Sequence, residues 1–548
     1  MKFARNQIAI LFSFLFIALS GCKEEEETLP KVKEEPNPNI AVNNWILKVM
    51  KEVYLWLPEM RSPIANTADP SAYFEALLNR PTDRFSVIYP DYKALINSLS
   101  GISLEAGYEF TLYRESSSNN NVVAEITYVK KNSPAATNGM QRGDYITRIN
   151  GTQLTLDNYK VQLGLISKPH TLITLRVNST SGALEARPEI SLAPVELAEN
   201  PNFLDSVYTI NGEKIGYVVY HFFAPGPGNN SSAYDQEMDA IFADFKTKGI
   251  QHLVLDFRYN GGGYVSSAVN LASLIGPGVT TTNIFSKTKY NSYLMQFDNL
   301  KNVQTPFKAK AENLGKVLKN NRVYVLTSTR TASASELIIN GLKPYMDVFL
   351  IGDKTTGKNV GSVPFEDEEN PKNPYGILPI ISRSFNSLDQ SEYTNGFLPN
   401  IEAKESSERL KPFGDVKELL LRKAIEQITG IDEVCVGSTT TFTTATTGGT
   451  WTSSTTSVAT INSSGVITGV SAGTATITYN FTNSQTTCSA SATKIVRVEV
   501  VPDVDPIAGS STVCKNQTIT LTNGVTGGVW SSNLTNIATV NPSTGVVT

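Results

Sequence analysis

Hydroxyl, amine and carboxylate groups are the side chains with which this chain can do chemistry, because it contains only 3 His and 4 Cys among 548 residues. That scarcity argues against a zinc site with several ligands. Two short segments are of interest: residues 331–336 (TASASE), with Ser333 at the start of a predicted helix, and residues 355–358 (TTGK), which end in Lys358. A serine hydroxyl is a weak nucleophile until a neighbouring base takes its proton, and a neutral lysine is one such base.

The simplest interpretation of Ser333 is structural. Serine is a preferred N-cap residue, and Glu336, three positions later, completes the pattern of a capping box. The serine alone therefore does not predict an enzyme. A chemical role requires the fold to bring it together with the lysine segment and with the glycine turn at residues 260–263 (NGGG).

Near-continuous apolar runs precede all three segments, at residues 252–257, 322–327 and 348–351. Such runs are typical of strands that are covered on both faces, and helical patterns follow the first two. The alternation of strands and helices predicts an α/β domain over residues 205–428. Ligands of parallel α/β sheets gather outside the carboxyl ends of the strands, where all three loops begin. We therefore expect the three segments to converge on one site.

The chain changes its pattern twice before this domain. Residues 41–99 carry apolar residues at helical spacing and predict a small helical domain. Residues 100–195 contain short β runs between turns, and their segments SPAA, GM, GDYI and ING closely resemble a PDZ domain. This resemblance implies a groove that takes a peptide C-terminus by strand addition and holds its carboxylate with backbone amides. The residues at the position of the carboxylate loop are Gly107, Tyr108, Glu109 and Phe110.

After Cys435 the composition shifts to Thr, Ser, Gly and Val, and the pattern repeats. The repeated positions include a cysteine and a tryptophan, Cys435 and Trp451 in one copy, Cys514 and Trp530 in the next. They predict two small β-sandwiches at residues 433–501 and 510–548, the second cut short, which resemble bacterial immunoglobulin-like repeats. Cys488 lies near the end of the first copy, so we expect a disulfide between Cys435 and Cys488 in an oxidising compartment.

Residues 1–22 predict a lipoprotein signal peptide. They have a basic start, an apolar run too short to span a bilayer, and the ending LSGC, which resembles the lipobox of bacterial lipoproteins. The resemblance implies that Cys22 is acylated. Residues 23–40 form an acidic linker, and its first residues are similar to the surface-export signal of Bacteroidetes lipoproteins. We expect a protein of the cell envelope, anchored by lipid to the outer membrane, with surface exposure implied by the export signal.

The overall composition narrows the class of protein further. Hydrophobic residues make up 40% of the chain, enough to bury several cores, and the length predicts more than one domain. The formal net charge is −4, from 47 basic and 51 acidic residues, which argues against a nucleic-acid partner. The fold class expected is multidomain α/β plus β.

The serine segment, the lysine segment and the glycine turn, in the order that they have here, resemble the C-terminal processing peptidases. These are serine proteases with a Ser–Lys dyad, and the resemblance extends over about residues 42–428. It implies that Ser333 is the nucleophile and Lys358 its general base. Lysine has an ordinary pKa of about 10.4, so burial must lower the pKa of Lys358 considerably for this role.

The tetrahedral intermediate of such a reaction needs backbone N–H donors. The candidates are the amides of Gly262 and Ala334, with Gly261 as an alternative to Gly262. The family pattern is not complete, because Pro344 and Ser362 stand where family members often have Asp and Gln. Ser362 and Glu336 are therefore only candidates for the groups that orient the lysine. The three histidines are interpreted as structural or surface residues: His170, His221 and His252.

Two functions remain open on the sequence. The leading hypothesis is a lipid-anchored serine endopeptidase that captures C-terminal tails of proteins or peptides in its PDZ groove and cleaves them through an acyl-enzyme. The alternative is a catalytically silent peptidase fold at the cell surface, whose PDZ and immunoglobulin-like modules bind a protein or glycan. Neither hypothesis implies a metal or an organic cofactor.

Overall fold

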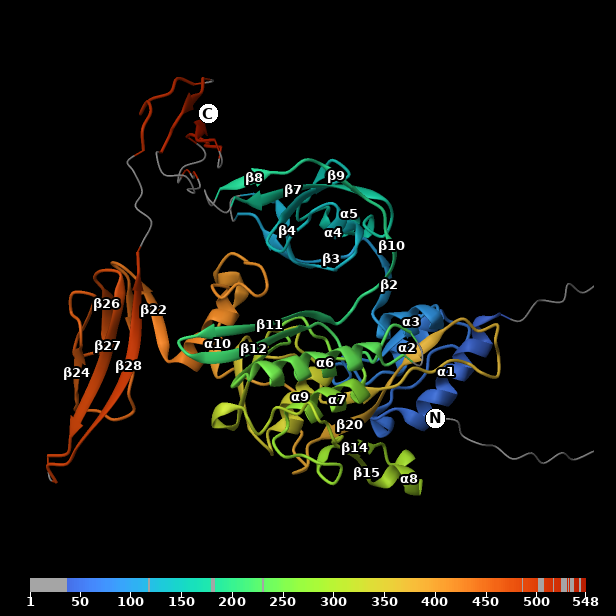
Figure 1. Ribbon diagram of the computed structural model, residues 1–548. Helices are drawn as coiled ribbons and strands as arrows, with labels where there is room; N and C mark the ends of the chain where they lie inside the picture. Colours follow the sequence, from blue (N-terminus) through green and yellow to red (C-terminus); the bar gives the residue numbers. More distant parts are fainter. Residues whose placement is uncertain are drawn as a thin grey trace, which may run out of the picture.

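The computed structural model describes residues 37–116, 119–178, 183–228, 231–484, 486–500, 507–515, 517–523, 530, 532, 537–541 and 544–548. The predicted signal peptide, with Cys22, and most of the acidic linker lie outside these residues. Along the described chain, no helix combines the length and apolar character needed to cross a membrane. The chain forms an N-terminal helical part, a β-rich domain, a central α/β part and a C-terminal β part (Figure 1).

The N-terminal part is helical, as the apolar spacing predicts. It contains α1 (Asn39–Val53), α2 (Pro70–Leu77) and α3 (Tyr92–Leu99). Asp69 caps α2 by accepting hydrogen bonds from two backbone N–H groups of its first turn. The short strand β1 (Val87–Tyr89) pairs with β19 (Gly376–Leu378) of the central part. The helical part is therefore docked on the central part rather than tethered to it.

The β-rich domain is built on one sheet with the strand order β3-β4-β5-β7-β8. Its main strands and helices are β3 (Tyr108–Arg114), β4 (Val122–Val129), α4 (Pro134–Thr137), β5 (Tyr145–Ile149), α5 (Tyr159–Gly164), β7 (His170–Val177) and β8 (Leu184–Ala186). The predicted runs in this region are confirmed as strands. β3 lies at an edge of the sheet. Two strands flank the domain in the chain, β2 (Ile102–Glu105) before it and β10 (Val195–Ala198) after it, and they pair with each other. This two-stranded ribbon carries the chain into and out of the domain.

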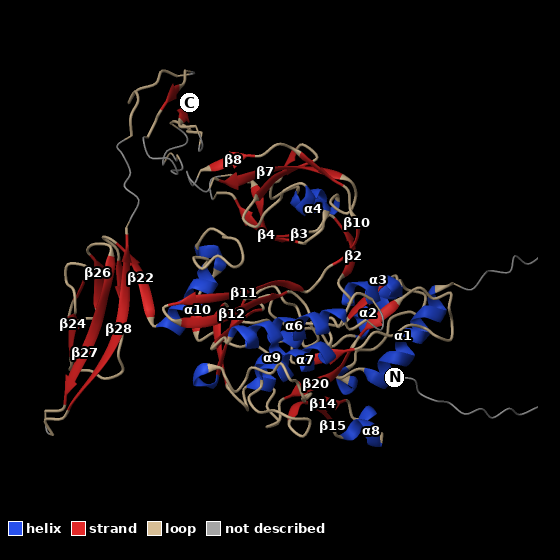
Figure 2. Ribbon diagram, viewed as in Figure 1, coloured by secondary structure: helices blue, strands red, loops and turns tan. Residues whose placement is uncertain are grey.

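The central part is a six-stranded sheet with helices on both faces (Figures 1 and 2). Its strands in sheet order are β11 (Asn202–Ile210), β12 (Glu213–Tyr220), β13 (His252–Asp256), β16 (Arg322–Thr327), β17 (Asp347–Gly352) and β21 (Ile401–Glu402). From β12 to β21 the neighbours are parallel, and β11 is antiparallel to β12. All five residues of β13 are buried, which explains its near-continuous apolar sequence.

Two apolar cores, one on each face, hold the helices to this sheet. One face packs against α6 (Ala233–Lys248), α7 (Val265–Ile275) and α9 (Ala334–Leu342), and the other against α10 (Leu419–Thr429). A second sheet packs beside α9. It has the order β15 (Val303–Pro306), β14 (Ile284–Tyr290), β20 (Ile380–Phe385) and β18 (Val360–Ser362). The α/β domain expected from the sequence is thus confirmed.

A buried ionic network joins the β-rich domain to the central part. Arg258, just after β13, pairs with Asp256 at 2.7 Å and with Glu418 at 2.6 Å, and its side chain is only 1% exposed. Glu405 accepts hydrogen bonds from both Arg258 and Arg142 of the β-rich domain. Removing one partner from a buried ion network destabilises the fold by several kcal/mol, so this network holds the β-rich domain in place on the central part.

The C-terminal part consists of two small sheets around a shared core. One sheet has the order β22 (Ile431–Cys435), β28 (Ser489–Glu499), β27 (Gly473–Thr482) and β24 (Thr450–Ser453). The other has the order β23 (Thr439–Thr441), β26 (Val466–Gly469) and β25 (Ala459–Ile461). Figure 2 shows this described part as strands and loops. The predicted second copy, at residues 510–548, is described only in fragments.

The expected disulfide between Cys435 and Cys488 is wrong. Among the described residues Cys435, Cys488 and Cys514 are all free thiols. Cys435 lies opposite Glu499 at the far end of β28, whereas Cys488 directly precedes the first residue of that strand. A strand of 11 residues separates them by roughly 35 Å, and a disulfide needs Cα atoms within about 7 Å. The sequence spacing placed the two cysteines near the two ends of one repeat copy. In the structure they lie at opposite ends of the long strand β28.

Candidate active site

Ser333 stands at the N-cap position of α9, at the carboxyl-end side of β16. Its backbone has φ 58° and ψ −113°, a conformation that is rare for a residue with a side chain. Strained backbone of this kind persists where the surrounding structure enforces it, and it is common at functional sites. The Ser333 N–H donates a hydrogen bond to Oε2 of Glu336 at 3.0 Å. The carboxylate half of the predicted capping box is therefore present.

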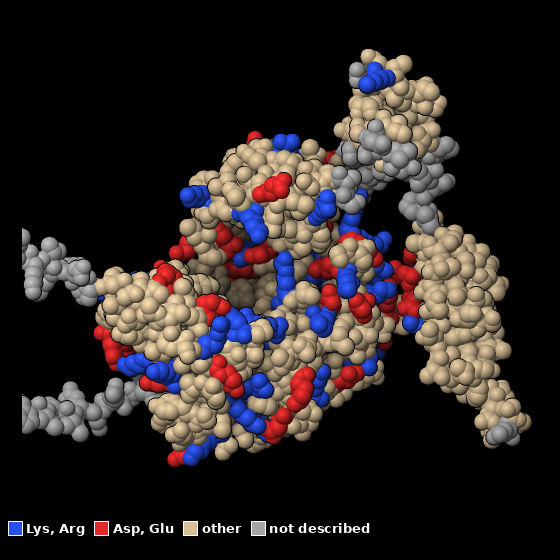
Figure 3. Space-filling view, turned by 180° about the vertical axis from the view of Figure 1, so that it is seen from behind, with Lys and Arg blue, Asp and Glu red and all other residues tan. Residues whose placement is uncertain are grey.

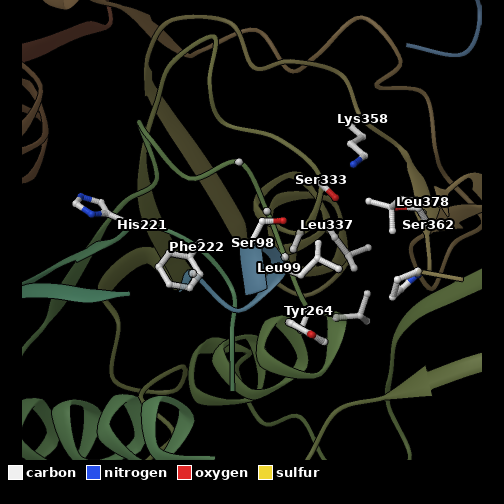
Figure 4. Close-up of a pocket in the computed structure, with 18 of the residues that line it drawn as sticks. Ser98, Leu99, His221, Phe222, Tyr264, Ser333, Leu337, Lys358, Ser362 and Leu378 are labelled. Carbon is white, nitrogen blue, oxygen red and sulfur yellow. The ribbon is translucent and has the colours of Figure 1, made fainter. Parts of the chain in front are cut away.

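Lys358 lies in the loop between β17 and β18 and faces the serine. In Figure 4 the Lys358 amine points toward Ser333, and both residues line the same cavity. Burial lowers the pKa of the Lys358 amine below its ordinary value, while the carboxylates of Glu336 and Asp83 act in the opposite direction. The net direction is toward the neutral amine, which is the form that can accept a proton.

The carboxylate of Glu336 ties the serine and lysine segments together. Glu336 is fully buried, and its Oε1 accepts hydrogen bonds from the Thr355 hydroxyl at 2.6 Å and from the Gly357 N–H at 2.7 Å. Its Oε2 accepts from the Lys358 N–H at 2.7 Å as well as from Ser333. The sequence suggested only a capping or supporting role for Glu336. The structure shows that one side chain sets the separation of the two candidate catalytic backbones.

The glycine turn reaches the serine, as expected. A Cβ atom at Gly262 would lie 2.6 Å from Cβ of Ser333, so only glycine permits this approach. The Gly262 N–H, however, donates to Oδ1 of Asn260 at 2.9 Å. We expected the Gly262 N–H to face the oxyanion, but the side-chain oxygen of Asn260 already accepts its hydrogen bond. No protein acceptor takes the N–H of Gly261 or Ala334 along the described chain, and both residues line the cavity.

Two residues of the N-terminal part also reach this site, and sequence reasoning missed them. Nη2 of Arg84 donates to the carbonyl oxygen of Gly357 at 2.8 Å and to that of Thr394 at 3.0 Å. The ring centroid of Phe85 lies 5.3 Å from Nζ of Lys358. Both residues lie more than two hundred positions before the lysine. No signal in a single sequence connects them with it.

The remaining predicted residues lie apart from the serine and lysine. Ser362 ends β18 and lines the cavity, but no hydrogen bond among the described residues joins it to Lys358. Gly107, with φ 84°, forms the turn before β3, whereas Tyr108, Glu109 and Phe110 already belong to that strand. The predicted carboxylate loop is thus shorter than expected. It lies in the β-rich domain and does not line the cavity of Ser333.

The cavity has a volume of about 800 Å³ and lies between the β-rich domain and the central part. Figure 3 shows this face hollowed below the β-rich domain, with acidic side chains at the rim. Apolar side chains line the part near the serine: Leu99, Val265, Leu337, Val360, Val363 and Leu378. The part of the cleft beside the serine is therefore suited to apolar groups of a bound molecule.

Comparison with known proteins places this fold in a family. Family models match three stretches, the peptidase S41 N-terminal domain at residues 41–87, a PDZ domain at 125–178 and peptidase family S41 at 214–402. A solved structure described as an S41 protease from Bacteroides fragilis is 30% identical, with a TM-score of 0.60. The match covers 70% of this chain and 97% of that one. The chain belongs to the S41 peptidase family and carries a PDZ domain.

Two curated relatives are similar over the same region. A probable CtpA-like serine protease from Staphylococcus saprophyticus is 27% identical over 250 residues, 45% of this chain and 44% of the relative. One from Staphylococcus aureus (strain COL) is 29% identical over 239 residues, 43% of this chain and 42% of the relative. The chain thus spans less than half of the length of these relatives.

Proposed function

We propose that this protein is a serine endopeptidase that cleaves protein tails with Ser333 as nucleophile and Lys358 as general base. The observation that carries the proposal is the pair itself. Ser333 and Lys358 line one cleft with the lysine amine pointing toward the serine, burial lowers the pKa of Lys358, and Glu336 holds both backbones. A neutral amine beside a serine hydroxyl is an activated nucleophile.

The reaction runs through an acyl-enzyme. The neutral Lys358 amine takes the proton of the Ser333 hydroxyl as Oγ attacks the carbonyl carbon of the scissile bond. Backbone N–H groups stabilise the oxyanion, with Ala334 as one donor and Gly261 as the other, because the Gly262 N–H is already bonded to Asn260. The lysine, now protonated, gives its proton to the leaving amine. Water then attacks the ester with Lys358 again as base, which releases the second product and restores both side chains.

Covalent labelling with a fluorophosphonate tests the proposal directly. The reagent requires an activated serine, so we expect one phosphonyl group on the peptide that contains Ser333, found by mass spectrometry after digestion. Labelling at another serine would overturn the assignment. A protein that binds tail peptides but takes no label would instead fit the alternative, a catalytically silent surface module.

The pH dependence of labelling depends on the surroundings of the lysine. The base works only when neutral, so labelling should rise with pH through the pKa of Lys358. In Phe85→Ala water reaches the amine, its charged form is better solvated, and the pKa returns toward the ordinary value. We expect the acidic limb of the labelling rate to move up by about one pH unit. Phe297→Ala, at an exposed site remote from the cleft, is the control; an unchanged limb in Phe85→Ala would contradict this account.

The edge strand of the PDZ domain supports capture of a C-terminal tail. The Glu115 N–H donates to the carbonyl oxygen of Asn121, and hydrogen-bonded pairs alternate along an antiparallel ladder. Thr111 therefore bonds toward β4, whereas the backbone groups of Phe110 face the open edge. A guanidinium N–H of Arg330, close to Ser333 in sequence, donates to the Phe110 carbonyl oxygen at 3.0 Å. An incoming strand takes the place of Arg330 at this acceptor.

Substitution in the turn before β3 should remove the preference for a free C-terminus. A Cβ atom at Gly107 would lie 2.2 Å from Cβ of Ser133, so Gly107→Ala distorts the carboxylate loop. We expect the unaltered protein to cleave a free-acid substrate about tenfold faster than its amidated form, roughly 1.4 kcal/mol, and Gly107→Ala to lose most of that ratio.

Gly151→Ala is the matched control for Gly107→Ala. Gly151 also has a positive φ in the PDZ domain, but its Cβ would meet open space. This variant should keep the ratio of free-acid to amidated cleavage. An equal loss of the ratio in both variants would show that general strain, not the carboxylate loop, is responsible.

Anchoring and the C-terminal repeats complete the proposal. We infer that Cys22 is acylated, that the protein is attached to the outer membrane, and that the two-sheet C-terminal part is an immunoglobulin-like repeat; its shared core supports the last point. Metabolic incorporation of an alkyne fatty acid, with Cys22→Ser as the control, tests the anchor. Incorporation that survives Cys22→Ser would place the lipid elsewhere.

A further inference from the structure

The strand β18, which begins two residues after Lys358, has one edge open along the cleft. The order of its sheet is β15-β14-β20-β18, so β18 is the last strand and pairs only with β20. All three residues of β18, Val360–Ser362, line the cleft, and so does Val363 directly after them. Consecutive side chains of a strand point to opposite faces, so a cavity on one face alone would not meet all of these residues. The cleft therefore runs along the edge of β18.

The backbone of Val360 has both of its polar groups on this open edge. The carbonyl oxygen of Asn359 accepts a hydrogen bond from the Ser384 N–H of β20 at 3.0 Å. The peptide bond between Asn359 and Val360 is trans, so its N–H points opposite to its carbonyl group and away from β20. The next residue, Gly361, pairs with Ser382 of β20, and the residues of an antiparallel ladder alternate in direction. The carbonyl oxygen of Val360 therefore faces the open edge as well.

Nothing in the described chain pairs with β18 on this side. Neither the N–H nor the carbonyl oxygen of Val360 has a hydrogen-bond partner among the described residues. Gly361 and Ser362 are half-buried, so the edge is accessible from the cleft. Unpaired backbone groups at the edge of a sheet are a template on which another chain can pair as a strand. The open edge of β18 is thus a binding surface for an extended peptide.

We propose that the substrate binds as an added strand on β18, with one of its residues paired to the N–H and the carbonyl oxygen of Val360. This proposal rests on the proposed function and adds a second backbone-binding edge, directly beside the lysine. It is distinct from the edge strand β3 of the PDZ domain, which belongs to another sheet. Only main-chain groups make the contact, so the ligand is an extended peptide segment, whatever its side chains.

Figure 4 indicates which part of the substrate lies on β18. Ser362 lies on one side of Ser333, and His221 lies on the other. The ring of His221 packs on Tyr128 of the PDZ domain, with the ring centroids 4.0 Å apart, so the PDZ domain is on the side of His221. A tail held by the PDZ domain leaves the scissile bond toward that side. The residues on β18 are therefore those before the scissile bond, which remain in the acyl-enzyme.

Two reagents that label Ser333 test the proposal. A plain fluorophosphonate carries no peptide, whereas a peptidyl phosphonate carries the four or so residues before the scissile bond and can form the added strand. Val360→Pro removes the N–H, and proline is tolerated at the first residue of an edge strand. We expect this variant to react about tenfold more slowly with the peptidyl reagent and at the unaltered rate with the plain one.

Val360→Ala is the matched control, because it shortens the same side chain and keeps the N–H. The ratio of the two labelling rates should stay as in the unaltered protein. If the ratio falls equally in Val360→Ala and Val360→Pro, packing of the side chain is responsible and the proposal is wrong.

Backbone methylation of the peptidyl reagent tests the strand geometry in the unaltered protein. Only alternate N–H groups of an added strand face its neighbour. We expect N-methylation at one position to slow labelling about tenfold, and N-methylation at the positions directly before and after it to have much less effect. In Val360→Pro the sensitive position should lose most of its effect, as in a double-mutant cycle.

The outcomes separate this inference from the proposed function. Equal sensitivity at neighbouring positions, or sensitivity at none, would overturn the added strand, whether or not Val360→Pro folds. A peptidyl reagent that labels the unaltered protein no faster than the plain one would overturn it too, and would leave the serine and lysine in their proposed roles. If neither reagent labels the unaltered protein, the proposed function itself is wrong.

Discussion

Ser333→Ala should abolish cleavage of an unstructured protein and leave the melting temperature almost unchanged. Loss of an N-cap serine costs about 1 kcal/mol, whereas loss of a nucleophile lowers kcat by about 10⁴-fold or more. Lys358→Arg should be equally inactive, because arginine stays charged near neutral pH and cannot take the serine proton. Cleavage is followed on gels, and melting by circular dichroism.

Each of these variants has a matched control in the same neighbourhood. Ser266 is an exposed serine in the same cleft, and Lys354 is an exposed lysine in the same loop as Lys358. Ser266→Ala and Lys354→Arg should cleave at the rate of the unaltered protein. Cleavage by Ser333→Ala at a comparable rate would remove the serine from the mechanism, and an active Lys358→Arg would remove the lysine.

Glu336→Gln should be the most damaging substitution that leaves both the serine and the lysine in place. Its two oxygens accept four hydrogen bonds, and an amide has only one acceptor oxygen, so its NH₂ group would face N–H donors. Each charge-assisted bond contributes about 1.5–3 kcal/mol, so we expect the free energy of unfolding to fall by about 3 kcal/mol or more. kcat should fall by about 100-fold because the lysine is no longer held against the serine.

The pH profile distinguishes this effect from general damage. The Glu336 carboxylate raises the pKa of Lys358, so its removal lowers that pKa further. The acidic limb of the residual labelling should move to lower pH, opposite to the direction expected for Phe85→Ala. Glu189→Gln, at an exposed glutamate outside the site, is the control. If the acidic limb of Glu336→Gln moves to higher pH instead, the Glu336 carboxylate does not raise the pKa of Lys358 and this account is wrong.

The elements that the sequence predicted best are those whose signal is local. β16 and β17 come from apolar runs, and the positions of Ser333 after β16 and of Lys358 after β17 follow from the pattern of parallel sheets. These are properties of ten or so neighbouring residues. The family resemblance added the roles of the two side chains, which no periodicity contains.

The contacts that the sequence could not predict all join residues far apart in the chain. The approach of Phe85 to Lys358 depends on how the N-terminal part docks, and the bond from Gly262 to Asn260 depends on one side-chain rotamer. The disulfide failed for a related reason. The repeat pattern placed Cys435 and Cys488 in one copy. Whether the two cysteines come close depends on the direction in which β28 runs, which the repeat pattern does not contain.

The clamp of Arg84 on Gly357 and Thr394 has a consequence for the order in which the protein matures. The chain is made from its N-terminus, so Arg84 and Phe85 exist long before the loop that they hold. The lysine obtains its apolar wall only after synthesis has passed Thr394 and the N-terminal part has docked. On the mechanism proposed above, a partly made chain therefore carries Ser333 without its proposed base in place, and the proposed activity begins only when the N-terminal part has docked.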